Sequence, residues 1–171
     1  MNAMTAKSCC LLLLTLAGCA FAPRAFATEC SVGASAVDFG IYDPTSTTAL
    51  DGQGSVTINC TNGPNTMVTI SLDTGGSGTY TPRRMVSGAE ILNYNLYTNV
   101  GRTIIFGNGT GTSTATCMTG TGLNQPDCTG NNPVGTNRNT VRTIYGRIPA
   151  LQNVTGAAGD FTDTITVTVT F

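Results

Sequence analysis

Cysteine side chains offer the clearest chemistry in this sequence. Four of its seven cysteines lie beyond residue 27, namely Cys30, Cys60, Cys117 and Cys128. Four cysteines can form two disulfides or hold one zinc ion. Because the sequence has no histidine and no Cys-x-x-Cys pair, it favours disulfides, which persist in oxidising compartments. Of the three pairings that four cysteines allow, we favour Cys30 with Cys60 and Cys117 with Cys128.

Catalytic chemistry has few residues to draw on. The sequence has no histidine and its one lysine is Lys7, so the commonest general base and the amine of Schiff-base enzymes are missing from the rest of the chain. The closest carboxylates are Asp160 and Asp163. On a strand these two would point to opposite faces, which argues against a paired acid and base. We therefore expect neither enzymatic activity nor a cofactor.

The first 27 residues have the features of an export signal. Lys7 precedes an apolar run from Cys9 to Ala22, and Ala25-Phe26-Ala27 offers a small-x-small cleavage site. The apolar run is short for a membrane span. A competing interpretation is a lipoprotein signal, because Leu16-Ala17-Gly18-Cys19 would leave Cys19 lipidated and the chain anchored to a membrane.

Residues 28–171 are expected to form one domain, since this length is sufficient for a hydrophobic core of its own. They carry six arginines and nine acidic residues, a net charge of −3. Nucleic-acid binding needs clustered basic side chains, and only Arg83 and Arg84 are adjacent. We therefore expect no nucleic-acid partner.

The segment from Asp160 to Phe171 alternates threonine with apolar residues, the pattern of a β-strand with one face in a core. Within it, the uncharged run from Ile165 to Phe171 has high β-propensity and is aggregation-prone unless another strand pairs with it or something shields it. It is therefore a candidate edge for accepting a strand. Its apolar face consists of Phe161, Ile165, Val167, Val169 and Phe171.

Other segments alternate in the same way, and none has helical spacing of apolar residues over enough length for a helix. A short return is expected over Thr103–Phe106. Between Gly107 and Asn139 the alternation lapses, which predicts a long loop tied by Cys117 and Cys128. The chain is therefore predicted to be all-β, a sandwich of antiparallel strands joined by turns. The expected inward residues are Val37, Phe39 and Ile41; Val56, Ile58 and Cys60; Val68, Ile70 and Leu72; Leu92, Tyr94 and Leu96; and Ile144 with Ile148.

Six short motifs follow one another along the chain. They are Cys30-Ser31-Val32; Val37-Asp38-Phe39-Gly40 with Tyr42-Asp43-Pro44; Gly54-Ser55-Val56-Thr57-Ile58-Asn59-Cys60-Thr61; Leu92-Asn93-Tyr94-Asn95-Leu96-Tyr97-Thr98; Tyr145-Gly146-Arg147-Ile148-Pro149; and Asp160-Phe161-Thr162-Asp163-Thr164. In this order and spacing they resemble the spore coat protein U domain, a family that includes subunits of archaic chaperone–usher pili. The resemblance covers essentially all of residues 28–171.

The resemblance implies an incomplete immunoglobulin-like β-sandwich that lacks its last strand and is completed by a strand donated from another chain. The implied partners are a periplasmic chaperone, an outer-membrane usher and other pilus subunits. The chaperone fills the open groove first, and the N-terminal extension of a neighbouring subunit later replaces it. In this family the chaperone also typically holds the C-terminal carboxylate, which here would be that of Phe171.

The segment before Cys30 departs from the pattern of a fibre-forming subunit. A donor strand needs about ten alternating residues before the first cysteine, but cleavage after Ala27 leaves only Thr28 and Glu29. This predicts a subunit that accepts a strand and donates none, as at the tip of a fibre. Cleavage after Ala20 would instead leave Phe21–Glu29, in which Pro23 makes a poor strand.

Three functions follow from these features. The first is a structural or adhesive pilus subunit, exported to the periplasm and then the cell surface, with a surface or glycan target in attachment and biofilm formation. The second is a secreted coat protein of a spore or resting cell. The third is a carbohydrate-binding module whose contact is the segment from Gly107 to Asn139.

Overall fold

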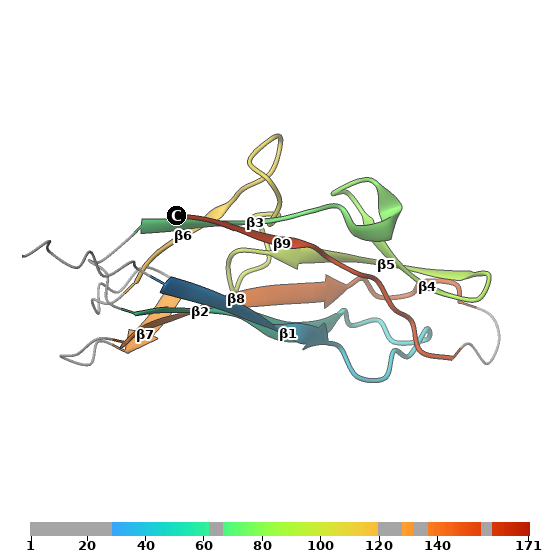
Figure 1. Cartoon of the computed structure of the whole chain (residues 1–171). Helices are drawn as coiled ribbons and strands as arrows, with labels where there is room; N and C mark the ends of the chain where they lie inside the picture. The colour runs from blue at the N-terminus through green and yellow to red at the C-terminus, as the bar shows by residue number, and fades with distance from the viewer. Residues whose placement is uncertain (1–28, 62–66, 120–127, 132–136, 155–158) are drawn as a thin grey trace, which may run out of the picture.

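Antiparallel strands in two layers make up the structure, a computed structural model that describes residues 29–61, 67–119, 128–131, 137–154 and 159–171 (Figure 1). The prediction of an all-β chain is confirmed. Within these ranges the only helical element is η1, a 3₁₀ turn over Gly75–Ser77. No helix in the described ranges is long and apolar enough to cross a membrane.

The strands form two sheets. The larger, six-stranded sheet has the order β1-β2-β8-β5-β4, with β7 also paired to β8, and the smaller sheet has the order β6-β3-β9. The bounds are β1 Glu29–Asp38, β2 Leu50–Thr61, β3 Met67–Leu72, β4 Arg83–Ser87, β5 Glu90–Tyr97, β6 Ala115–Met118, β7 Cys128–Asn131, β8 Asn137–Ile148 and β9 Val167–Thr170.

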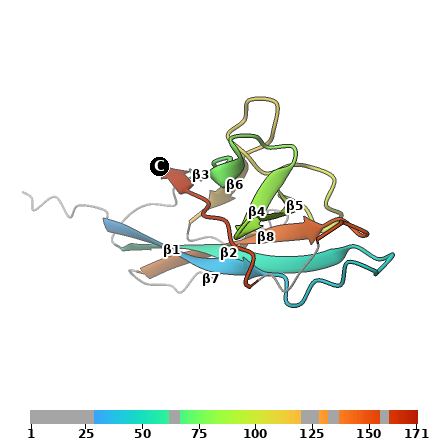
Figure 2. The ribbon, with the colours of Figure 1, turned by 90° about the vertical axis from the view of Figure 1, so that its right-hand side faces the viewer.

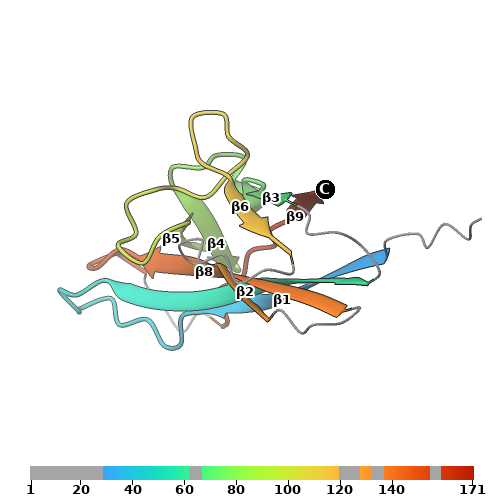
Figure 3. The ribbon, with the colours of Figure 1, turned by 90° about the vertical axis from the view of Figure 1, so that its left-hand side faces the viewer.

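The larger sheet curls around the core. In Figure 1 β1, β2 and β7 lie below β3 and β9, and Figure 2 shows β4 and β5 rising towards the layer of β3. Figure 3, from the opposite side, shows β6 above the lower layer. Two strands share one edge of β8 in succession, since β7 pairs with residues 139–142 and β5 with residues 145–147.

The alternating residues of four predicted strands make up the core, which confirms those strands. Each of these side chains is at most 4% exposed, because successive residues of a strand point to opposite faces of its sheet. They are Val56, Ile58 and Cys60 of β2; Val68, Ile70 and Leu72 of β3; Leu92, Tyr94 and Leu96 of β5; and Ile144 and Ile148 of β8. The return at Thr103–Phe106 is also present, as a bridge between Tyr97 and Ile105.

The first strand lies earlier in the chain than expected. β1 ends at Asp38, whose carboxylate accepts a hydrogen bond from the Gly40 backbone N–H at 2.8 Å. Gly40 has a φ of 70°, a conformation that glycine adopts without steric cost. This turn takes the chain out of the sheet, so the prediction for Ile41 was wrong and its side chain is 95% exposed.

Two expectations for the C-terminal half also need correction. The segment from Gly107 to Asn139 is not one loop, because it contains β6 and β7 and the start of β8. β6 and β7 have four residues each, and together with the start of β8 they contain few large apolar residues, so they carry little apolar alternation. The last strand is also shorter than expected: β9 covers Val167–Thr170, and Thr162 forms an isolated bridge with Val86. The short β4 was not predicted.

Candidate strand-accepting groove

An open groove of about 420 Å³ runs between β1 and the C-terminal segment. β1 and β9 are the edge strands at corresponding ends of the two sheets. The core residues of other strands form the bottom of this groove. They are Leu72, Met85, Tyr94, Leu96 and Ile144.

The β1 side of the groove is apolar and uncovered. Val32 lies opposite Ile58 in the register of β1 with β2, and opposite residues point to the same face of a sheet. Ile58 is fully buried, whereas Val32 is 46% exposed. The same holds for Ala34, which is exposed although its partner Val56 is buried. The core face of β1 therefore has no strand over it in the described part of the chain.

The C-terminal side is uncovered in the same way. Val167 lies opposite Leu72, yet Leu72 is buried and Val167 only half-buried. Thr166 directs both backbone groups towards Asp73, whose N–H donates to the Thr166 C=O at 3.1 Å and whose carboxylate accepts from the Thr166 N–H at 2.9 Å. Backbone groups alternate sides along a strand, so those of Val167 and Val169 point to the groove. Among the described residues β9 pairs with β3 alone.

One polar pair interrupts the apolar groove. The Tyr94 hydroxyl donates to the Asp163 carboxylate at 2.6 Å, which also accepts from the backbone N–H groups of Gly76 at 2.9 Å and Thr164 at 2.8 Å. Burial raises the pKa of Tyr94, and the hydrogen bond to Asp163 raises it further, so the hydroxyl remains a donor. Asp163 therefore fastens the C-terminal segment to η1 and β5. The described residues hold no group of three His, Cys, Asp or Glu placed to bind a metal ion.

Asp73 holds the next part of the C-terminal segment. Its carboxylate accepts from the backbone N–H groups of Gly75 at 3.0 Å and Thr166 at 2.9 Å. Burial opposes ionisation of Asp73, but the hydrogen bonds from Thr166 and Gly75 and the charge of Arg83 lower the pKa of its carboxyl below the ordinary value. The ionised carboxylate therefore holds the Thr166 backbone, beside the groove residues Ile165 and Val167, at neutral pH.

Arg83 binds the backbone of Asp73 and was missed by the sequence reasoning. Its side chain is fully buried, and its guanidinium donates to the backbone C=O of Asp73 at 2.7 Å and of Phe106 at 2.7 Å, and to the Asn95 side-chain oxygen at 2.9 Å. Burial lowers the pKa of Arg83. The one signal in the sequence was its alternation with Met85, in a strand that was not predicted.

Three glycines let the end of β1 fold onto the core face of β2 and β8. An added Cβ on Gly52 would lie 2.5 Å from the Asp38 carbonyl oxygen, and one on Gly146 would lie 2.6 Å from the Phe39 ring. Gly54 meets the backbone of Ala36 at 2.8 Å in the same way. Glycine within a strand marks such close approaches. The close contact places the residues from Ala36 to Phe39 at the groove.

The Spore Coat Protein U domain model matches residues 17–168. The chain belongs to this family. Among relatives of the Spore Coat Protein U domain, it is 32% identical over 157 residues to "Protein U" of Myxococcus xanthus, a match that covers 83% of this chain and 77% of that protein.

This Spore Coat Protein U domain is also similar to a chain of known structure. That chain belongs to the crystal structure of the CsuC-CsuE chaperone-tip adhesion subunit pre-assembly complex from archaic chaperone-usher Csu pili of Acinetobacter baumannii, with 28% identity and a TM-score of 0.52. The match covers 85% of this chain and 40% of that chain, so this chain spans less than half the length of the solved one. The prediction of an immunoglobulin-like sandwich is confirmed by this likeness.

The Spore Coat Protein U domain has the two disulfides preferred from the sequence. Cys30–Cys60 joins β1 to β2 next to the groove. Cys117–Cys128 joins β6, at the end of the smaller sheet opposite β9, to β7, which pairs with β8 in the larger sheet. The second disulfide therefore links the two sheets at the end of the smaller sheet away from β9.

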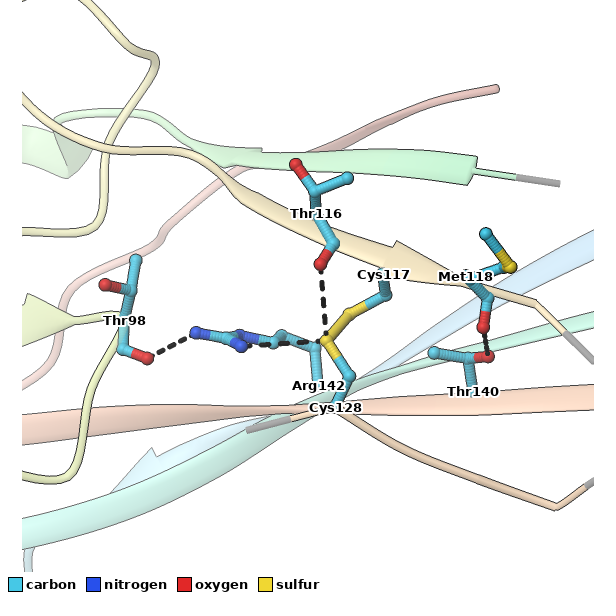
Figure 4. The surroundings of a disulfide bond; sticks show 7 residues. All are labelled: Thr98, Thr116, Cys117, Met118, Cys128, Thr140 and Arg142. Carbon is cyan, nitrogen blue, oxygen red and sulfur yellow. Dashed lines mark hydrogen bonds between the residues drawn. A yellow bond between two sulfur atoms is a disulfide. The ribbon is translucent and has the colours of Figure 1, made fainter. Parts of the chain in front are cut away.

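Figure 4 shows the surroundings of Cys117–Cys128. The buried Arg142 guanidinium reaches the backbone C=O of Thr98 and lies 3.6 Å from the Cys128 sulfur. The Thr140 hydroxyl of β8 donates to the backbone C=O of Met118 in β6 at 2.9 Å. A hydrogen bond between the sheets therefore accompanies the covalent link.

The residues expected to form the accepting edge do not all lie in the groove. Phe161, Ile165 and Val167 line it, and Val169 packs against the core next to them. Phe171 is 56% exposed beyond the end of β9. Sequence reasoning missed the other side of the groove, β1, because Ser31, Gly33 and Ser35 alternate there with small apolar residues.

Proposed function

We propose that this chain is a structural, non-enzymatic subunit of a chaperone–usher pilus that accepts a β-strand from a partner protein. The observation that carries the proposal is the exposure of Val32 across from the fully buried Ile58. A strand placed between β1 and β9 would cover these residues and pair with both edges, as in β-strand addition. Such a strand also removes the aggregation risk of two unpaired edges.

The order of partners follows from the same risk. We infer that a periplasmic chaperone occupies the groove first, that an outer-membrane usher takes over the complex, and that another subunit supplies the final strand. The similarity to a chain of a chaperone–subunit pre-assembly complex supports this order. Residues 1–27, which lie outside the described residues, would direct export and then be removed, with lipidation of Cys19 as the competing route.

We further propose that the subunit sits at the fibre tip and acts in adhesion and biofilm formation. The short segment expected between the cleavage site and Cys30 supports this position, because it provides too few residues for a donor strand. N-terminal sequencing of the exported protein tests it. A mature protein that starts upstream of about residue 20 would remove the basis for the tip position.

Co-expression with a periplasmic chaperone of an archaic chaperone–usher system tests the proposed function. The expected result is a soluble complex in which backbone amides of Val167 and Val169 exchange more slowly than in the protein alone. The matched control is Val68 in β3, which is fully buried already and should not change. A stable monomer that neither binds the chaperone nor aggregates contradicts the proposal.

The match to Protein U favours a second candidate, a secreted coat protein of a resting cell. The two functions differ in the location of the assembled protein. Immunogold labelling on thin fibres supports the pilus, whereas a uniform layer on the cell supports the coat. Binding to a glycan array that disappears when the loop closed by Cys117 and Cys128 is deleted would instead support the carbohydrate-binding module.

A further inference from the structure

Four apolar side chains lie where the groove meets a second cavity. A second cavity of about 480 Å³ adjoins the first, and the residues that line both are Val37, Phe39, Met85 and Phe161. We call these four side chains the waist. Two of them come from the end of β1, and the other two come from β4 and the C-terminal segment.

Contacts with neighbouring elements fix both sides of the waist. The Phe39 ring packs edge-on against Tyr94, with 5.9 Å between ring centroids, and rests where Gly146 has no side chain. On the other side, Phe161 precedes Thr162, which exchanges two backbone hydrogen bonds with Val86 at 3.0 and 3.1 Å. These contacts hold the Phe39 ring against Tyr94 and fix the backbone next to Phe161.

The two cavities differ in what their walls offer an inserted strand. Before the waist, β1 and β9 present edges with backbone groups for a ladder. Beyond it the walls are the turn from Gly40 to Pro44 and residues 159–160, and the Tyr42 hydroxyl there is already bonded to the backbone of Pro149 and Gln152. Beyond the waist, an inserted strand therefore has no regular strand edge with which to form backbone hydrogen bonds.

We propose that the waist ends the accepting groove and sets the register of the inserted strand. The inward residue nearest Phe39 and Phe161 must be small, whereas inward residues nearer Val167 fill the cavity with larger aliphatic side chains. This inference rests on the proposed function and adds a residue-level requirement on the donor. It assigns Phe39 and Phe161 as positioning residues for the strand.

A tethered strand tests the inference in the full chain. A two-residue Asn-Gly turn after Phe171 would start a hairpin with β9, followed by eleven residues that alternate valine and threonine. In this register the eleventh residue lies opposite Phe161 and the fifth opposite Val167. The probes are the same strand with glycine or leucine at position eleven, and a matched control with leucine at position five.

Glycine at position eleven is expected to give the highest Tm. Leucine there should lower the Tm by about 5 °C or more, the scale expected when one side chain overpacks a chain of this size. Leucine at position five should leave the Tm within about 2 °C of the parent strand. The variant Phe161→Ala should remove most of the penalty of leucine at position eleven.

Two results overturn the inference, and they are distinguishable. Equal Tm values for glycine and leucine at position eleven mean that the strand passes the waist, and this leaves the proposed function intact. If no tethered strand raises the Tm or slows exchange at Val167, the groove does not accept strands and the proposed function fails as well.

Discussion

Gly146→Ala is the sharpest test of how β1 is held at the groove. The new Cβ would lie 2.6 Å from Phe39 Cζ and 2.7 Å from Val37 Cγ1, compared with about 3.5–4.0 Å for an ordinary carbon contact. The neighbours would have to move by about 1 Å, which disturbs the contact of Phe39 with Tyr94. Overpacking of this kind costs about 1–3 kcal/mol, and removing a strand glycine returns about 0.5–1 kcal/mol.

Gly33→Ala provides the matched control. Gly33 also lies within a strand of the larger sheet, but nothing lies within 4 Å of an added Cβ. The control should therefore gain about 0.5–1 kcal/mol from reduced freedom of the unfolded chain. Urea unfolding of the disulfide-intact proteins, followed by circular dichroism, gives both free energies by linear extrapolation.

We expect Gly146→Ala to be less stable than Gly33→Ala by about 1–3 kcal/mol, because the gain from removing a glycine is the same in both and only the overpacking differs. We also expect it to bind the chaperone more weakly, because the displaced Phe39 ring would occupy part of the groove. If the two variants were equally stable, the close contact between β1 and β8 would not constrain the fold, and the reasoning on the waist would lose its support.

Three further predictions follow from the contacts described above. Val32→Asp should abolish chaperone binding in a pull-down while Ser31→Asp, on the opposite face of β1, retains it, because a charge at Val32 would be buried under the inserted strand. Cys60→Ser should lower the free energy of unfolding by about 3.7 kcal/mol and Cys117→Ser by about 2.8 kcal/mol in the chain-entropy picture, since the cysteines are 30 and 11 residues apart; equal losses in calorimetry would contradict this. The pKa of Asp73 is lowered from its ordinary value of 3.8, so its contribution is complete above that pH and is lost as the pH falls through the folded-state pKa. Asp73→Asn should accordingly flatten the decline of Tm below about pH 4, and an unchanged acid profile would exclude Asp73 as its source.

The core could be predicted from the sequence because period-2 alternation is a direct consequence of strand geometry. Val56, Ile58, Val68 and Ile70 follow that pattern without interruption, and all four are buried. The same pattern failed at Ile41, where one hydrogen bond from Gly40 to Asp38 takes the chain out of the sheet. The apolar alternation continues through this turn, so the pattern alone could not reveal that the strand ends before Ile41.

The groove was only half predictable. The C-terminal side could be predicted from the threonine alternation that ends at Phe171. β1 could not, because its small residues carry little pattern and their exposure results from the absence of a covering strand in the described part of the chain. The glycines at 52, 54 and 146 interrupt the strand pattern in the sequence. The sequence does not show that residues 36–39, far away in the chain, pack against them. Arg83 was hidden for the same reason, because its partners are backbone carbonyls that the fold alone brings together.

The placement of Cys117–Cys128 has a mechanical consequence for any occupant of the groove. Because this bridge joins β6 covalently to β7, a bulky insertion separates the layers less at β6 and β7 than at β1 and β9. The displacement is then largest at Val32 and Val167 and smallest around Arg142. Partners that differ in side-chain size can therefore be accommodated at the opening while the packing around the sulfur atoms stays unchanged.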